Sequence, residues 1–280
     1  MKNYKRQTGN FADALRKVAA AKQTFATPKE GIIDRMNQGV SSKVCKRWAW
    51  FNASFNEVNG EILATNSQFN PLSVFDETTG KFIYAQKVTE AMRTGEFYLT
   101  PDILLGNESA SKVLLRVAER DEKKPINLKR VINLGKLKTH NVPTDCYADV
   151  DTIVFLLGGH NRARKYGLFV RNAFGENSIP ESKVYMQDLI GKDKSRGFAL
   201  DRVSTDSRSD FYCYDRYLYN ENGSVFGGYE SAEGAQKNSR AEVKTYTPRQ
   251  SSQYIRILKA VMGGKQGTSK LEKVLKFFKQ

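Results

Sequence analysis

The sequence predicts a mixed α+β fold, with a β-rich body that contains hairpins and with basic helical segments at both ends. Three observations lead to this prediction: helix-start signals near the N-terminus, alternating side chains in the next segment, and two capped amphipathic patterns near the C-terminus. The expected organisation has a basic helical arm, a mixed body with a basic helical insertion, and a basic helical C-terminal segment. Their boundaries are 1–39, 40–247 with the insertion at about 101–140, and 248–280.

Two helices are predicted in the N-terminal arm. Asn10 can cap a helix whose apolar residues recur at helical spacing from Phe11 onward. Thr27 and Glu30 stand three residues apart and form a capping box, and Gly39 offers a stop for the second helix. The arm is therefore expected to be helical.

The clearest hairpin signal follows the arm. Residues Val44–Val58 alternate between two faces, and Trp48 and Trp50 lie together on one of them. Asn59-Gly60 supplies the residues with positive φ that a tight turn requires, and Glu61–Ala64 returns as the second strand. The alternation and the turn together predict an antiparallel strand pair.

The rest of the body is expected to contain further strands and two insertion helices. The continuous apolar run at 150–157 predicts a central strand that is buried on both faces. The insertion is expected to form helices at 109–120 and 126–134. The other expected strands are 72–75 paired with 81–84 around Thr79-Gly80, 166–170, and 211–219 returning through Asn222-Gly223 into 224–229.

Two helices are predicted at the C-terminal end. Thr247-Pro248 opens the first, and Gly263-Gly264 stops it. Ser269 and Glu272 form a capping box that opens the second helix, in which four lysines accompany an apolar stripe. This end of the chain is thus expected to present a basic helical surface.

Composition excludes several classes of protein. A hydrophobic content of 40% and an aromatic content of 11% exclude wholesale disorder. The longest apolar runs fall far short of the ~20 residues that a membrane span needs, and no secretory signal follows the basic start of the chain. The three widely spaced cysteines suit free thiols. We therefore expect a cytoplasmic protein, or one within a viral particle assembled in the cytoplasm.

The net charge of +15 is unevenly distributed. Residues 1–60 carry a net +7, residues 111–140 a net +6 and residues 241–280 a net +7, whereas 61–110 carry −4 and 141–240 carry −1. Solubility alone does not need this segregation, because interspersed charges serve a surface equally well. The pattern favours a polyanionic partner.

Nucleic acid is the polyanion that the charge pattern favours, because each neutralised phosphate releases counterions and adds affinity that does not depend on sequence. Two alternatives are lysines that are merely solvated on helix faces, and a basic helix lying on anionic lipid; membrane attachment is the rarer of these readings. The residues predicted to contact phosphate are Lys2, Lys5, Arg6, Lys112, Arg116, Lys123, Lys124, Lys129, Arg130, Lys265, Lys270, Lys273, Lys276 and Lys279.

Aromatic side chains accompany the basic ones in one predicted strand. Phe211, Tyr212, Tyr214, Tyr217 and Tyr219 place rings on both of its faces. Such rings can stack on bases, but rings in strands more often fill a sheet interface. The sequence leaves both roles open.

One motif indicates an enzymatic alternative. Glu242 and Lys244 form a strand-like E-x-K ahead of a helix, and this pattern resembles half of the motif of PD-(D/E)xK nucleases. The resemblance implies a divalent metal, Mg²⁺, held by Glu242 and by an upstream acid, for which Asp215 is the first candidate and Asp210 the second. Asp215 is not preceded by the proline of that motif, and an exposed strand would explain the same residues.

The sequence therefore favours a non-enzymatic structural subunit that contacts the phosphate backbone of nucleic acid inside a larger assembly, such as a virion or another nucleoprotein complex. No cofactor is expected for this role. Other protein subunits of the assembly are expected to bind the balanced body. The alternative is a metal-dependent nuclease of the PD-(D/E)xK type, which would need Mg²⁺.

Overall fold

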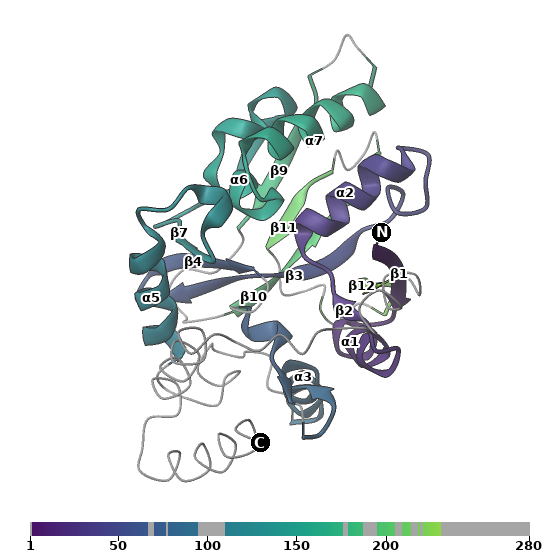
Figure 1. Cartoon of the computed structure of the whole chain (residues 1–280), viewed down its shortest axis with the longest axis vertical. Coiled ribbons are helices and arrows are strands. Elements are labelled where there is room, and N and C mark those ends of the chain that lie inside the picture. The colour runs from purple at the N-terminus through teal and green to yellow at the C-terminus, as the bar shows by residue number, and fades with distance from the viewer. Residues whose placement is uncertain are drawn as a thin grey trace, which may run out of the picture. The chain divides into compact units, whose positions relative to one another are not determined.

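A ten-stranded, mostly antiparallel sheet forms the centre of the described chain, and helices lie on both of its faces (Figure 1). The mixed α+β class with a β-rich body is thereby confirmed. The computed structural model describes residues 2–66, 70–76, 78–94, 110–175, 179–186, 195–204, 209–213, 218 and 221–230. The described residues up to Tyr229 belong to one unit, and the unit that contains Glu230–Gln280 lies almost wholly outside them.

Strand β3 lies at the middle of the sheet order β1-β12-β3-β10-β11-β9-β8, with β4 and β7 continuing from β3 and with β2 added to β12. Pairs β3/β12 and β9/β11 are parallel. The strands of this sheet are β1 (Lys2–Thr8), β2 (Thr24–Phe25), β3 (Ala49–Val58), β4 (Glu61–Asn66), β7 (Val131–Asn133), β8 (His140–Pro143), β9 (Glu181–Tyr185), β10 (Ser195–Leu200), β11 (Phe211–Cys213) and β12 (Ser224–Glu230).

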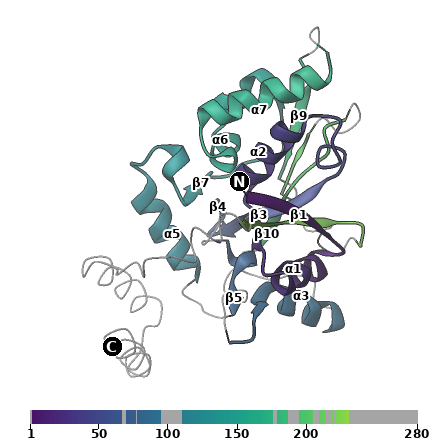
Figure 2. The same cartoon turned by 45° about the vertical axis from the view of Figure 1, so that its right-hand side comes forward.

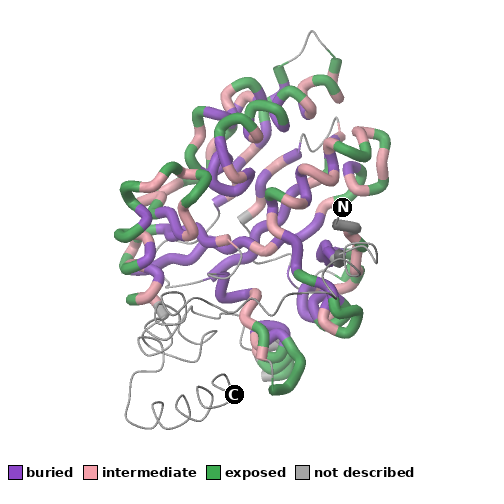
Figure 3. The backbone as a smooth tube through the Cα atoms, viewed as in Figure 1, coloured by how far each residue is buried: buried purple, intermediate pink, exposed green. Residues whose placement is uncertain are grey.

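Helices cover the two faces of the sheet with separate apolar clusters (Figures 1 and 2). Helices α2, α6 and α7 pack on the face that carries Phe51 and Phe198. Helices α1 and α3 pack on the opposite face, around Trp50 and Ala199. Buried residues therefore lie along the centre of the sheet, and exposed residues lie on the outer sides of the helices (Figure 3). The longer helices are α1 (Phe11–Ala20), α2 (Pro28–Gln38), α3 (Ile83–Thr94), α5 (Ala110–Asp121), α6 (Asp151–Leu157) and α7 (His160–Ala173).

The N-terminal helices start where the sequence predicts. The Asn10 side chain accepts a hydrogen bond from the backbone of Asp13, and Thr27 and Glu30 form both hydrogen bonds of a capping box. Gly39 follows the last residue of α2. In front of these helices, strand β1 is paired with β12, so the first residues of the chain are part of the sheet.

The predicted hairpin of β3 and β4 is confirmed. Val58 pairs with Glu61, and the turn residues Asn59 and Gly60 have φ of 55° and 80°. Strand β3 begins at Ala49 rather than at Val44. The second predicted hairpin has its turn where expected, but its strands β5 (Phe75–Asp76) and β6 (Lys81–Phe82) are only two residues long and form a separate sheet.

The prediction of a central strand at 150–157 is wrong, because this segment is helix α6. Every residue from Thr152 to Leu157 is buried, so no polar face reveals the helical period. Asp151 begins the helix, and Gly158 ends it in the left-handed conformation with φ of 72°.

The prediction of a strand at 166–170 is also wrong, because these residues belong to helix α7. Its buried residues Ala163, Tyr166, Gly167 and Val170 recur at helical spacing. A Cβ on Gly167 would lie 2.0 Å from the carbonyl oxygen of Thr144, so glycine allows this close approach. Part of the segment predicted as a strand therefore forms the inner face of the helix.

The basic insertion contains one of its two predicted helices. Helix α5 confirms the first, and Leu114 and Val117 on its inner face contact β4 and β7. The second prediction, at 126–134, is wrong: a short 3₁₀ helix (Ile126–Leu128) is followed by strand β7. Residues 101–109 lie outside the described residues.

Strand β12 forms as predicted but pairs with other strands than expected. It lies between β1 and β3, and both β3 and β10 separate it from β11. A Cβ on Gly228 would lie 2.8 Å from the ring of Tyr4, and one on Gly227 would lie 2.3 Å from Gln23. The two glycines therefore let β1 and β2 approach β12 closely.

Among the described residues, none of the helices combines the length and the apolar character that a membrane span requires. The predicted helices of the C-terminal segment, 248–280, lie outside the described residues.

Candidate nucleic-acid interface

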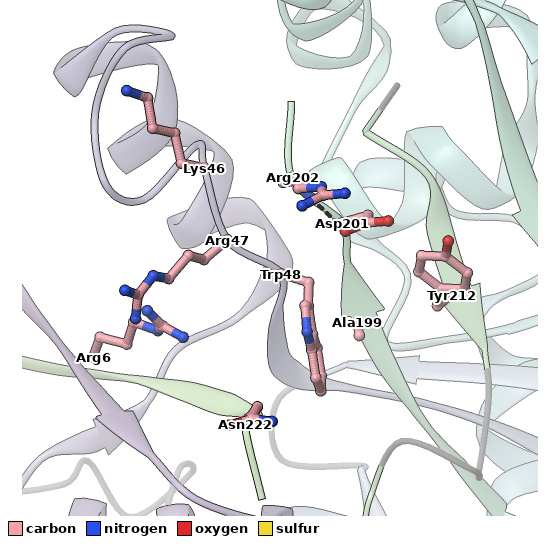
Figure 4. A pocket seen from close by; sticks show the side chains of 9 residues that line it. All are labelled: Arg6, Lys46, Arg47, Trp48, Ala199, Asp201, Arg202, Tyr212 and Asn222. Carbon is pink, nitrogen blue, oxygen red and sulfur yellow. Dashed lines mark hydrogen bonds between the residues drawn. The ribbon is translucent and has the colours of Figure 1, made fainter. Parts of the chain in front are cut away.

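A hollow of about 650 Å³ lies at the end of the sheet where β3 and β12 begin and β10 ends. Four cationic side chains and one carboxylate, that of Asp201, line it together with aromatic and small residues. Trp48 stands at its centre, with Arg6 and Arg47 on one side and Asp201 on the other (Figure 4). The four cationic residues are Arg6, Lys46, Arg47 and Arg202.

The side chains of Arg6 and Arg47 point toward one another on the same side of Trp48 (Figure 4). Burial, and then the nearby charge of Arg47, lower the pKa of Arg6. The Arg6 Nε is buried and has no hydrogen-bond partner within the described part of the chain. None of the ion pairs found among the described residues involves either arginine. The two guanidinium groups thus lie close together, and no carboxylate is paired with either of them within the described part of the chain.

A buried arginine supports the floor of this hollow. Arg35 is fully buried on α2, and its guanidinium donates to the carbonyl oxygens of Arg47 at 3.1 Å, Leu200 at 3.2 Å and Asp201 at 2.5 Å. It also donates to the hydroxyl of Tyr166 at 3.1 Å. These bonds join the start of β3 to the end of β10, so Arg35 positions both sides of the hollow.

Two of the lining aromatic rings are held in place by other rings. Trp48 meets Trp50 edge to face, with ring centroids 4.7 Å apart. Tyr212 stacks on Tyr185 with centroids 4.6 Å apart and an angle of 10° between the rings. The Lys183 ammonium lies 4.7 Å from the centroid of the Tyr185 ring. The rings are therefore fixed before any ligand binds.

The carboxylate of Asp201 is the acidic group of the hollow. Burial raises its pKa, while hydrogen bonds from the backbone of Arg202 and the side chain of Tyr212 act in the opposite direction. Burial and the charge of Asp201 raise the pKa of Tyr212, which keeps its phenol protonated as a donor. Asp201 thus presents acceptor oxygens on the side of Trp48 that lies away from Arg6.

One of the predicted phosphate contacts in the N-terminal arm lies in the hollow. Arg6 lines it, whereas Lys5 is exposed on the neighbouring position of β1. The side chain of Lys2 lies outside what the structure describes. The structure therefore brings together Arg6 and residues from distant segments.

Two of the predicted basic residues of the insertion bind a buried acid. Asp121 is fully buried and accepts hydrogen bonds from the Lys124 side chain and from both the backbone and the side chain of Arg130. Burial acts to raise the pKa of Asp121, but these hydrogen bonds prevail and lower it to about 2. Lys112, Arg116 and Lys123 are exposed, and Lys129 is half-buried. Two of these six cations are therefore paired within the fold.

The remaining predicted site residues lie outside the described residues. This holds for Lys265, Lys270, Lys273, Lys276 and Lys279, which were expected to contact phosphate. It also holds for the nuclease candidates Asp215, Glu242 and Lys244. Among the residues that the structure describes, no group of three or more His, Cys, Asp or Glu residues is placed to hold a metal ion.

Sequence reasoning missed most of the hollow. Arg47 and Trp48 were assigned only to the faces of a strand, and Arg202 lies in a segment whose net charge is −1. Tyr212 was considered for base stacking on its ring alone. Arg47 and Arg202 flank the ends of β3 and β10 in the structure, but the predicted strand began at Val44 and no strand was predicted near Arg202, so no sequence signal joined the two residues.

Comparisons with known proteins give little further information. No protein-family model matches the chain, and no curated protein matches it. A solved structure that does match is described as "Accommodation of massive sequence variation in Nanoarchaeota by the C-type lectin fold". The chain is similar to that structure with a TM-score of 0.48 and 12% identity, over 82% of this chain and 96% of that chain.

Proposed function

We propose that this chain is a non-enzymatic protein that contacts the phosphate backbone of nucleic acid through the hollow at Arg6 and Arg47, as one subunit of a larger assembly. The observation that carries the proposal is the pair of arginines that face one another with no carboxylate paired to either within the described part of the chain. Placing two guanidinium groups side by side is unfavourable unless an anion lies between them. The pair is therefore suited to bind an anionic ligand.

The chemistry of arginine supports phosphate as that anion. Guanidinium groups present several N–H donors in a planar fork, which matches the oxygens of phosphate. The unpaired Nε of Arg6 offers one such donor. Neighbouring Lys46 and Arg202 add positive charge to the same hollow. A phosphate placed there would gain hydrogen bonds and would relieve the repulsion between the arginines.

The aromatic residues favour nucleic acid over other polyanions. Trp48 and Tyr212 line the same hollow as the arginines, and both rings are half-exposed. Bases stack on aromatic rings whatever their sequence, and proteins that bind nucleic acid combine such rings with cationic grooves. A sulfated polysaccharide or a lipid surface has no base to stack there.

The test is binding of short DNA and RNA strands as a function of salt. Affinity should fall by orders of magnitude between ~50 and ~200 mM salt if several phosphates are contacted. The double variant Arg6→Gln, Arg47→Gln should bind at least about tenfold more weakly at low salt and should reduce the slope of log K against log salt by about 2.

A matched control tests whether the effect belongs to the hollow. The variant Arg164→Gln, Lys165→Gln removes the same number of charges from exposed positions of α7, which were not predicted to contact phosphate. It should bind nucleic acid nearly as well as the wild type. Equal loss in both variants, affinity that does not change with salt, or equal binding to anionic lipid vesicles would overturn the proposal.

A further inference from the structure

Resting on the proposed function, we infer that the hollow binds single-stranded rather than duplex nucleic acid, with one unpaired base between Trp48 and Tyr212 and its phosphate at Arg6 and Arg47. The site would then select strands whose bases are free to leave a stack. This preference concerns the shape of the site, whereas the proposed function concerns its charge.

The register of the sheet supports a site for one base. Ala199 pairs with Trp50 on one side and with Tyr212 on the other, and Tyr212 pairs with Tyr185. Residues that pair directly lie on the same face of a sheet. An aromatic row with a single alanine in the middle therefore crosses this face of β3, β10, β11 and β9.

The helices cover only part of this row. Trp50 and Ala199 are 1% and 4% exposed in the cluster of α1 and α3, whereas Tyr212 and Tyr185 are half-buried. The small Ala199 side chain leaves space between the rings of Trp48 and Tyr212, and all three line the hollow. The hollow is therefore a slot in the sheet face with a ring on each side.

The charges around the slot favour one orientation of a nucleotide. Arg6 and Arg47 lie on one side of Trp48, whereas Asp201 lies on the other side next to Arg202, whose charge acts on it (Figure 4). The two arginines therefore attract a phosphate more strongly than the side of Asp201 and Arg202, where the carboxylate offsets the cation. The acceptor oxygens of Asp201 suit the amino groups on the edges of bases. A nucleotide that spans the slot would thus place its sugar-phosphate on the arginine side and its base on the aspartate side.

The size of the hollow suits a single nucleotide better than a duplex. A volume of about 650 Å³ falls in the range of about 300–1,000 Å³ that is typical for sites of small ligands. Paired bases are stacked on their neighbours and cannot enter such a slot without being flipped out, which costs a few kcal/mol. Unpaired bases need only leave a single-strand stack.

Tryptophan fluorescence provides a direct test, because the chain has only two tryptophans. Trp50 is 1% exposed, whereas Trp48 lines the hollow. Three probes of equal length would be compared: a single-stranded 12-mer, its duplex, and an abasic 12-mer that keeps the phosphates. The single strand should bind at least about tenfold more tightly than the other two and should quench the fluorescence.

Variants separate the ring from the fold. Trp48→Ala should weaken binding of the single strand by about tenfold or more and leave the weaker binding of the abasic strand unchanged. Trp48→Phe should restore most of the affinity while abolishing the quenching. Phe75→Ala removes a ring that is 44% exposed on β5 and should alter neither. Melting temperatures show whether each variant is folded.

The outcomes distinguish this inference from the proposed function. Equal affinity for all three probes without quenching would overturn the single-strand inference, but the chain would still bind phosphate through its arginines. Absence of binding to every probe at low salt would overturn both. Tight binding of the single strand with no loss in Trp48→Ala would also overturn the inference, because the base would then lie elsewhere.

Discussion

The hollow and the basic insertion both gather cationic side chains, but the fold places opposite charges beneath them. Under the hollow lies Arg35, a buried cation whose guanidinium is bound by backbone carbonyls. Under the insertion lies Asp121, a buried anion that binds Lys124 and Arg130. The first buried group adds positive potential at the surface, whereas the second cancels it.

The number of cations in a segment therefore does not determine whether that segment attracts an anion. The charges of Lys124 and Arg130 stabilise the loop after α5. Those of Arg6 and Arg47 have no such partner within the described part of the chain, so they are available to a ligand. Stability measurements should therefore distinguish the two regions as clearly as binding does.

The largest expected effect is that of removing the buried cation. Arg35→Leu would leave three carbonyl oxygens and the hydroxyl of Tyr166 without their donor, and we expect a loss of about 3–5 kcal/mol in the free energy of unfolding. Urea titration measures this value. A loss below about 1 kcal/mol would show that the two sides of the hollow are held by other contacts.

The equivalent change under the insertion should be smaller. Asp121→Ala removes the acceptor of the Arg130 backbone N–H and of two half-exposed cations, and a loss of about 2 kcal/mol is expected. Binding of nucleic acid should not weaken. If affinity instead fell together with stability, the insertion would be part of the contact surface and the comparison would fail.

The same carboxylate should give the wild type a distinct dependence on pH. Because folding lowers the pKa of Asp121 from 3.8 to about 2, its stabilisation is fully present above pH 3.8 and is lost as the pH falls toward 2. The difference in stability between the wild type and Asp121→Asn should shrink over this window. A constant difference between pH 5 and pH 2 would contradict the assigned hydrogen bonds.

A change at the β3–β4 turn provides a reference outside both regions. Gly60 has φ of 80°, a conformation that a β-branched residue adopts poorly, so Gly60→Val should cost about 1–3 kcal/mol. Binding per folded molecule should remain that of the wild type. An unchanged melting temperature would mean that the turn relaxes without cost.

The smallest expected effect is that of neutralising the hollow itself. Since burial and Arg47 lower the pKa of Arg6, the fold disfavours the charge of Arg6, and Arg6→Gln should change stability by less than about 0.5 kcal/mol. Thermal unfolding at low salt measures the change. A marked loss would show that Arg6 stabilises the fold instead of serving a ligand.

Capping and turn residues predicted the local structure correctly where a single sequence pattern dominates the segment. The capping box at Thr27 and Glu30 and the turn at Asn59-Gly60 are set by neighbours in sequence, and both form as predicted. Helix α6 was missed because burial on all sides hides its period. The pairing of β12 with β1 could not be predicted, since it depends on contacts between opposite ends of the described unit.

The candidate site was only partly predictable for the same reason. Arg6 was identified from charge alone, but its neighbours Arg47 and Arg202 come from segments that are distant in sequence. Segment totals also hid Arg202, because acids elsewhere in 141–240 balance it. The insertion shows the reverse error, since Asp121 is a single acid among many cations, yet it is buried and binds two of them.

The position of β12 also determines when this site can form during protein synthesis. Strands β1 and β2 leave the ribosome before β12, but both pair with it, and β12 is made some two hundred residues later. At translation rates of about 5–20 residues per second, the nascent chain waits on the order of ten seconds or more for that partner. Until then β1 has an unpaired edge that can associate with other chains. Release of the full β12 segment is therefore the step that both joins β1 and β2 to the sheet and brings Asn222 to the hollow that Arg6 lines.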